Sequence, residues 1–216
     1  MTRAIIFDFD GLIVDTETAI YQAWAELYQK FDQELLLSDY SQCVGSDFAT
    51  SYDPQTALEE RHGKPIEWDN VIPEKDERIR ELLLAQDTRP GVRQLIEQIS
   101  DAGLDRAVAS SSTFNWVGGW LRKLGLDHHF PIVRCRDHVE RIKPSPDLFL
   151  AAAEKLGVAP HEALVLEDSV NGLKAANAAG IPCVIVHNTV TSAGDFAGAR
   201  NVFHSFEYLS LNDLVS

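Results

Sequence analysis

The 216-residue chain has few basic side chains and no long apolar run. Lys and Arg number 19 against 33 Asp and Glu, so the formal net charge is −14 and no basic cluster is available for nucleic acid or an anionic membrane. The apolar segment after Arg3 is interrupted by Asp8 and Asp10. We therefore expect neither a signal peptide nor a membrane span there.

Cysteine is also scarce. Cys43, Cys135 and Cys183 are widely separated and form no CxxC pair. This spacing argues against a structural zinc site and predicts free thiols in a reducing cytoplasm. No sequence feature indicates a partner protein, and we expect a monomer.

Short apolar runs alternate with helical patterns over most of the chain. The runs that predict strands are residues 4–9, 106–109, 131–133, 163–166, 182–186 and 201–203. The helical patterns between them cover about residues 91–102, 114–124, 147–156 and 170–179. This alternation predicts an α/β fold, with a parallel sheet flanked by helices. Ser145 is expected to cap the third of these helices, with Pro146 in its first turn.

Residues 15–87 break the alternation. They contain helical patterns at about 18–30 and 74–86 and no convincing strand. The stretch is too long for an ordinary loop, and Pro90-Gly91 marks the return of the α/β rhythm. We predict a core domain formed by residues 1–14 and 88–216, and an inserted helical domain formed by residues 15–87.

The first predicted strand ends in two acids. Alternation along the strand puts Asp8 and Asp10 on one face, where two close carboxylates are costly unless a cation lies between them. Gly11 then permits a tight turn and a close approach to a ligand. The motif taken alone fits a metal site, and it also fits a strand-end turn whose acids point into water.

Three further strand ends carry polar groups. Ser110 and Ser111 offer hydroxyls and backbone N–H groups to an anion, and Glu167-Asp168 stands directly before a helix. Lys143 lies in a loop that Pro144 and Pro146 stiffen. Helix capping, surface solvation and the helix dipole are sufficient explanations for each motif by itself. Their joint occurrence at successive strand ends favours a shared phosphate and metal site.

The motifs resemble those of the haloacid dehalogenase superfamily, in the subgroup of β-phosphoglucomutase and its phosphatase relatives. The matching stretches are DFDGLIVDTE at 8–17, SSS at 110–112, KPSPDLF at 143–149 and EDSVNGLKAANAAG at 167–180. The resemblance implies a Rossmann-like core and an α-helical cap over the active site, with hinges near 15–17 and 88–90. It also implies Mg²⁺-dependent hydrolysis of a small phosphomonoester, such as a sugar phosphate.

The resemblance assigns roles to individual residues. Asp8 is the implied nucleophile, which forms an aspartyl-phosphate, and Asp10 is the implied general acid and base. Ser110, the backbone N–H of Ser111 and Lys143 are implied to hold the phosphoryl group.

The same resemblance implies the ligands of the magnesium ion. They are a carboxylate oxygen of Asp8, the backbone carbonyl of Asp10 and the carboxylate of Asp168. Glu167 is implied either to bind the ion directly or to support one of its ligands.

The predicted cap departs from the family pattern. Ile20 stands where many relatives carry His, and Asp47 lies near the place where the mutase has an Arg for a second phosphate. Both departures count against a mutase. Cations on the cap could come from Lys75, Arg78 or Arg80, although each also fits an exposed helix position. Near the Lys143 loop, Ile142 stands where relatives often have Gly.

Two alternatives to a phosphatase stay open. A phosphomutase would use the same scaffold and give an isomerised sugar phosphate in place of free phosphate. A non-catalytic phosphate-responsive signalling module would also use acids, a hydroxyl and a Lys, but such modules place the phosphorylated Asp on a middle strand and have no helical insert. Dehalogenase chemistry is not expected, because that branch needs no metal and lacks an acid at the position of Asp10.

Overall fold

A computed structural model describes residues 2–45 and 52–215 of the chain. Its centre is a six-stranded sheet in which every neighbouring pair of strands is parallel. The strands are β1 (Ala4–Phe7), β2 (Asp105–Ala109), β3 (Ile132–Arg134), β4 (Ala163–Glu167), β5 (Cys183–Val186) and β6 (Asn201–Phe203). Their order, β3-β2-β1-β4-β5-β6, is that of a Rossmann-like fold, which confirms the predicted fold class.

The helices fall into two groups along the chain. Between β1 and β2 lie α1 (Thr16–Lys30), α2 (Leu37–Tyr40), α3 (Pro54–His62), α4 (Trp68–Leu83) and α5 (Val92–Asp101). After β2 come α6 (Phe114–Lys123), α7 (Asp147–Leu156), α8 (Val170–Ala179) and α9 (Leu211–Val215). Single 3₁₀ turns occur at Asp127–His129, Arg136–His138, Pro160–Glu162 and Phe206–Tyr208.

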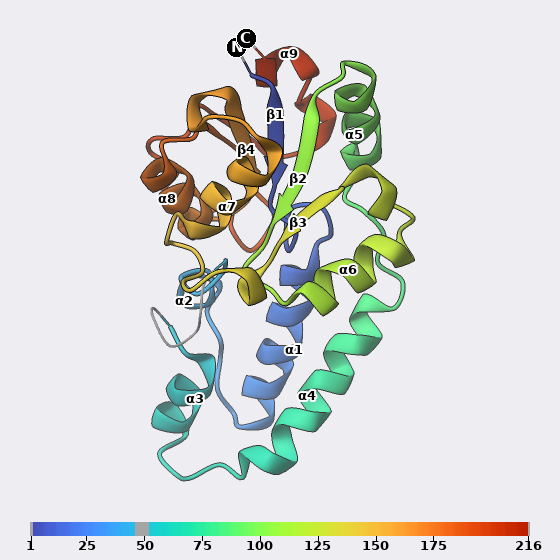
Figure 1. Cartoon of the computed structure of the whole chain (residues 1–216). Coiled ribbons are helices and arrows are strands. Elements are labelled where there is room, and N and C mark those ends of the chain that lie inside the picture. Colours follow the sequence, from blue (N-terminus) through green and yellow to red (C-terminus); the bar gives the residue numbers. More distant parts are fainter. Residues whose placement is uncertain (1, 46–51, 216) are drawn as a thin grey trace.

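Strands β1, β4 and β5 at the centre of the sheet are buried on both faces, as their continuous apolar character requires. Ile5 and Phe7 of β1 pack with α5, α6 and α9, whereas Ala4 and Ile6 face α7 and α8. Figure 1 shows α7 and α8 on one side of the sheet and α5 and α6 on the other. Because all six strands are parallel, their carboxyl ends lie along the same edge of the sheet, at the ends of the strands.

Helices α1, α3 and α4 lie beyond that edge (Figure 1). They share an apolar cluster that includes Trp24, Tyr28 and Leu58, is joined by Val190 from the loop after β5, and is distinct from the two clusters of the sheet. Asp15 caps helix α1, because its carboxylate accepts a hydrogen bond from the backbone N–H of Thr18 at 3.1 Å. No strand of the sheet comes from the described part of residues 15–87.

Several local predictions need correction. Ser145 does not cap α7, because its hydroxyl donates to the Asp147 carboxylate at 2.7 Å and Pro146 occupies the cap position. Helix α4 begins at Trp68, six residues before the predicted start, and it accommodates Pro73 within its second turn. Both errors concern where helices begin near proline, which sequence patterns fix poorly. Among the described residues, no helix is long and apolar enough to cross a membrane.

Candidate active site

The strand order reverses between β1 and β4, and the predicted site residues gather at that point. Asp8 follows β1, while Glu167 ends β4 and Asp168 comes next. Parallel sheets commonly bind ligands at such a reversal, because the loops after the two strands turn to opposite sides of the sheet. Asp8, Asp10, Ser110 and Ser111 line one pocket of about 370 Å³. The structure therefore brings together residues that are more than 150 positions apart in the sequence.

A buried lysine joins two of the acids. Lys143 is 1% exposed, and its ammonium donates to Oδ1 of Asp8 and, at 2.7 Å, to Oε1 of Glu167. Burial alone lowers the pKa of Lys143, but the charges of these two carboxylates outweigh it and hold the pKa above its ordinary value. The two carboxylates thus favour the charged form of Lys143 beside Asp8.

The acids outnumber this cation. Burial raises the pKa of Asp8 to about 8 despite the opposing charge of Lys143, and burial also raises the pKa of Asp168, with Glu167 and Asp8 adding repulsion. Carboxylate oxygens of Asp8, Glu167 and Asp168 all lie within 4.8 Å of one another. Three acids that share one lysine leave a deficit of positive charge, which a divalent cation would correct.

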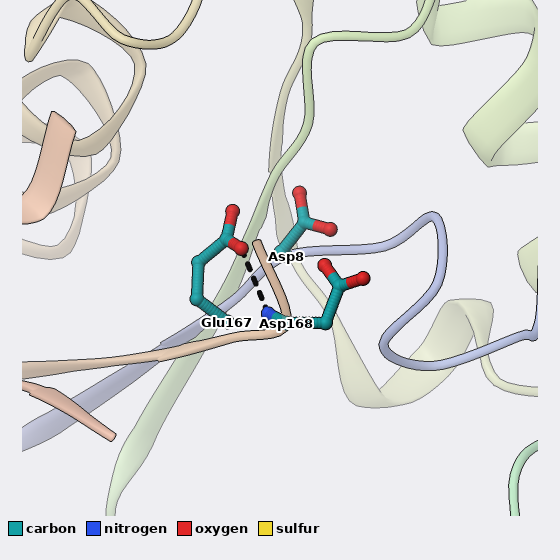
Figure 2. A group of neighbouring side chains, drawn as sticks. All are labelled: Asp8, Glu167 and Asp168. Atoms are coloured by element: carbon teal, nitrogen blue, oxygen red, sulfur yellow. Dashed lines mark hydrogen bonds between the residues drawn. The ribbon is translucent and has the colours of Figure 1, made fainter. Parts of the chain in front are cut away.

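The hydrogen bonds distinguish the acids as possible metal ligands. Oε2 of Glu167 accepts from the backbone N–H groups of Asp168 and Ser169, both at 2.8 Å, while Lys143 occupies Oε1. Figure 2 shows the Glu167 carboxylate turned back onto its own main chain and the carboxylates of Asp8 and Asp168 next to each other. Glu167 thus fits a supporting role better than direct binding.

Asp168 is oriented by an amide from the next loop. Nδ2 of Asn188 donates to Oδ2 of Asp168 at 2.7 Å and to the backbone carbonyl of Gly11 at 3.1 Å. No hydrogen bond within the described residues reaches Oδ1 of Asp168 or the carbonyl oxygen of Asp10. Oxygen atoms of this kind are the ligands that Mg²⁺ prefers, so the residues present fit the implied ion.

The Asp10 carboxylate is surrounded by donors. Oδ1 accepts from the hydroxyl of Thr16 at 2.9 Å and from the indole N–H of Trp116 at 2.8 Å. Oδ2 accepts from the hydroxyls of Ser112 at 2.7 Å and Ser110 at 3.3 Å. The side chain is therefore held in one orientation at the wall of the pocket.

The serine loop after β2 leaves one donor available. The N–H of Ser110 donates to the Arg134 carbonyl, and the N–H of Ser112 donates to the Ser110 hydroxyl. The N–H of Ser111 has no acceptor among the described residues, although its hydroxyl donates to the Gly45 carbonyl at 3.0 Å. A backbone N–H that faces a pocket without a partner is suited to an anionic oxygen.

Sequence patterns alone did not single out several of these groups. Thr16 lies inside the recognised DTE stretch, so its position was available from the motif. Trp116 and Asn188 belong to no motif, and only the three-dimensional fold brings them to the acids. Glu17 was expected only as part of a hinge, yet its side chain is 9% exposed and lines the pocket.

Ile20, which departs from the family pattern, and the basic residues considered as cap cations have structural roles in the helical region. Ile20 packs against its apolar cluster, and Lys75 lies 4.7 Å from the ring centre of Trp24. Arg78 pairs with Glu26 at 2.8 Å. Arg80, the third residue considered as a source of positive charge on the cap, pairs with Glu77 at 2.6 Å. Asp47 lies outside the described residues.

Ile142 forms part of the pocket wall next to Lys143. It is partly buried and packs against the apolar cluster that α7 and α8 form with the sheet. Its side chain therefore joins the loop that carries Lys143 to the core.

The fold and the acid cluster define a hydrolase of the haloacid dehalogenase type. The model of the family described as haloacid dehalogenase-like hydrolase matches residues 5–186, which is most of the chain. The chain therefore belongs to this family.

Individual relatives agree with this assignment. YhcW of Bacillus subtilis is 42% identical over 191 residues, which cover 88% of this chain and 86% of the relative. The fructose-1-phosphate phosphatase YqaB of Escherichia coli is 31% identical over 182 residues, covering 84% and 95%. A crystal structure of a CbbY mutant from Rhodobacter sphaeroides in complex with xylulose-(1,5)bisphosphate superposes with a TM-score of 0.77 at 30% identity, covering 99% of each chain.

Proposed function

We propose that this protein is a magnesium-dependent phosphatase that hydrolyses a small phosphomonoester through an aspartyl-phosphate on Asp8. The observation that carries the proposal is the buried contact of Asp8 with Lys143, beside the free oxygen of Asp168 and the free N–H of Ser111. Phosphoryl transfer depends mainly on positioning and charge, and this arrangement supplies both. The sugar phosphates named for YqaB and CbbY make a sugar phosphate the favoured substrate class.

The reaction divides into two steps at the residues of the pocket. A carboxylate oxygen of Asp8 attacks phosphorus, the bond from phosphorus to the leaving oxygen breaks, and Asp10 gives that oxygen a proton. Asp10 then takes a proton from water as the water attacks the aspartyl-phosphate, which releases phosphate and restores Asp8. Lys143 and the Ser111 N–H stabilise the phosphoryl oxygens in both steps. Asp8, the backbone carbonyl of Asp10 and Asp168 would hold the metal ion, which would supply positive charge to offset that of the phosphate.

We also propose that residues 15–87 form a cap domain on a core of residues 1–14 and 88–216. The two connections run beside each other, because Val14 and Thr88 form an antiparallel bridge. Arg89 holds the second connection to the core by donating to the carbonyls of Gly11, Val186 and His187 at 2.7–2.8 Å. Two adjacent connections permit a hinge motion that would exclude bulk water while phosphate is transferred.

The remaining expectations are consistent with this function. The three cysteines lie in the described part of the chain, form no disulfide there and are buried, which supports the proposal of a reducing cytoplasm. We retain a monomer and a small phosphorylated metabolite as the expected state and partner. No observation favours the mutase, and the two activities differ in whether phosphate or an isomerised sugar phosphate is released.

The test is a screen of phosphorylated metabolites for phosphate release in the presence of Mg²⁺. Chelation with EDTA should abolish release, and added Mg²⁺ should restore it. Asp8→Asn should reduce turnover by more than about a thousandfold, because the nucleophile is lost, with an unchanged circular dichroism spectrum. Substantial activity in EDTA or in Asp8→Asn would contradict the proposal.

A further inference from the structure

The four donors around Asp10 are not equivalent. Those of Ser110, Ser112 and Thr16 are hydroxyls, which can rotate toward another acceptor without moving the chain. The indole N–H of Trp116 has one direction, which the ring fixes. Among the described residues, the carboxylate therefore has one donor that cannot be redirected, and that donor is on Oδ1.

The ring of Trp116 is itself held in place. It packs edge-on against Trp120 with ring centres 6.0 Å apart, and Trp120 is 7% exposed. Lys123 lies 4.1 Å above the Trp120 ring and donates to the carbonyls of Leu83 and Leu84 at 3.2 Å. Trp116 thus presents a fixed N–H to the pocket from the first turn of α6.

The two oxygens of Asp10 therefore keep different hydrogen bonds when substrate enters. A phosphoryl group at Ser110 would draw the serine hydroxyls away from Oδ2, because a phosphate dianion is the stronger acceptor. Oδ1 would keep the indole N–H. Oδ2 is then free to carry a proton and to donate it to the oxygen that joins phosphorus to the leaving group.

We propose that Trp116 is a positioning residue that fixes Oδ1 of Asp10, so that Oδ2 is the oxygen that exchanges the proton. The proposal rests on the phosphatase function above. In the first step the proton passes from Oδ2 to the leaving alkoxide as its bond to phosphorus breaks. In the second step Oδ2 takes a proton from the attacking water.

The kinetic test uses a series of substituted phenyl phosphates, from 4-methoxyphenyl to 4-nitrophenyl phosphate. These substrates share a shape, but a poor leaving group needs the proton more than 4-nitrophenolate does. In Trp116→Phe, the ratio of kcat/KM for 4-nitrophenyl over 4-methoxyphenyl phosphate should rise about tenfold. A substitution that only weakened substrate contacts or loosened the fold would lower kcat/KM by the same factor for every substrate. That result would overturn the proposal.

Trp68→Phe is the matched control. The Trp68 indole donates to the Glu59 carboxylate at 2.6 Å within the helical region, so the variant loses the same kind of bond far from Asp10. Its kcat/KM ratio should equal that of the wild-type protein. If Trp116→Phe does not fold, 3-benzothienylalanine at position 116 retains the ring shape without the N–H and should give the same tenfold change.

A second measurement does not depend on turnover. The four tryptophans give four indole N–H resonances in a ¹⁵N spectrum, and Trp116→Phe identifies one of them. Asp10→Ala should shift the Trp116 resonance and leave the Trp68 resonance unchanged. An unmoved Trp116 resonance would overturn the positioning role even if the enzyme hydrolyses phosphate esters. A shifted resonance in a protein that hydrolyses none of them would refute the phosphatase function while supporting the contact.

Discussion

Glu17 is a buried acid that the proposed mechanism does not use. Its side chain is 9% exposed and lines the pocket, and no hydrogen bond to its carboxylate occurs within the described residues. Burial raises its pKa to about 8, with further repulsion from Asp10 and Asp8. A carboxyl group with these neighbours binds a proton in the folded protein at pH values where the unfolded chain has lost it.

This difference gives a pH-dependent prediction for the metal-free protein. The ordinary pKa of the Glu17 carboxyl is 4.5, so between about pH 4.5 and 8 the folded state holds the extra proton and the free energy of unfolding falls as pH rises. Glu17→Gln has no such proton. Its Tm relative to wild type, measured in EDTA by calorimetry, should therefore increase between pH 5 and pH 8 by at least about 2 °C.

The exposed α7 residue Glu154 supplies the control for that experiment. Glu154→Gln should keep a constant Tm difference from wild type across the same range. A constant difference for Glu17→Gln as well would mean that burial of Glu17 does not retain its proton.

The turn from β4 into α8 is the element on which the acid cluster depends. Ser169 caps α8 by accepting from the Gly172 N–H at 3.0 Å, and Glu167 folds back over this first turn. A Cβ atom placed on Gly172 would overlap the Glu167 carboxylate. The absence of a side chain at position 172 therefore lets Glu167 reach both Lys143 and the backbone of its own turn.

Gly172→Ala should lower the free energy of unfolding by about 1–3 kcal/mol, because Glu167 or α8 must move. Turnover should fall with it, since Glu167 orients Lys143. Gly119→Ala in α6 is the control, because no atom lies within 4 Å of its added Cβ. It should stabilise the protein by about 0.5–1 kcal/mol, as Ala does in a helix. Urea denaturation measures the free energy of unfolding of the two variants, and activity assays measure their turnover. Equal effects of the two substitutions would contradict this account of the turn.

The element scale also shows what the sequence could predict. The acids were predictable because strand ends in a parallel sheet converge, so a residue's position directly after a strand determines its place. Lys143 lies further along the chain, beyond β3 and a 3₁₀ turn, and the KPSPDLF stretch of the family resemblance indicated it. The contact of Trp116 with Asp10 was not predictable, because it depends on how α6 is oriented relative to the sheet. The prediction was wrong about two helix starts. The Ser145 hydroxyl bonds to Asp147 in place of capping α7, and α4 begins at Trp68 and continues through Pro73. The division at residues 15–87 stays a prediction, supported by the separate apolar cluster of the helices.

At the scale of the whole molecule, the charge of −14 and the buried acids act in the same direction. Both are costs to the metal-free fold, because like charges repel and buried carboxylates lack water. A divalent cation that binds only the folded protein offsets part of this cost and raises stability in proportion to its occupancy.

Mg²⁺ should therefore raise Tm even when no substrate is present. At a hundred times its Kd the ion would contribute about 2.7 kcal/mol, or about 5–10 °C for a chain of this size. Asp168→Asn should lose most of this shift, while Asp101→Asn at the exposed end of α5 should retain it. Differential scanning fluorimetry with and without EDTA measures the shift. An equal response of the two variants would remove Asp168 from the metal site.

The described ends of the chain lie together at the edge of the sheet remote from the acids (Figure 1), and the Thr2 hydroxyl donates to the Leu214 carbonyl at 3.0 Å. Attachment to a bead or an electrode through either end would therefore leave the pocket facing the solution. The same proximity permits a short linker to join the two ends and new termini to be opened in a surface loop, which would yield a circular permutant with an undisturbed catalytic edge.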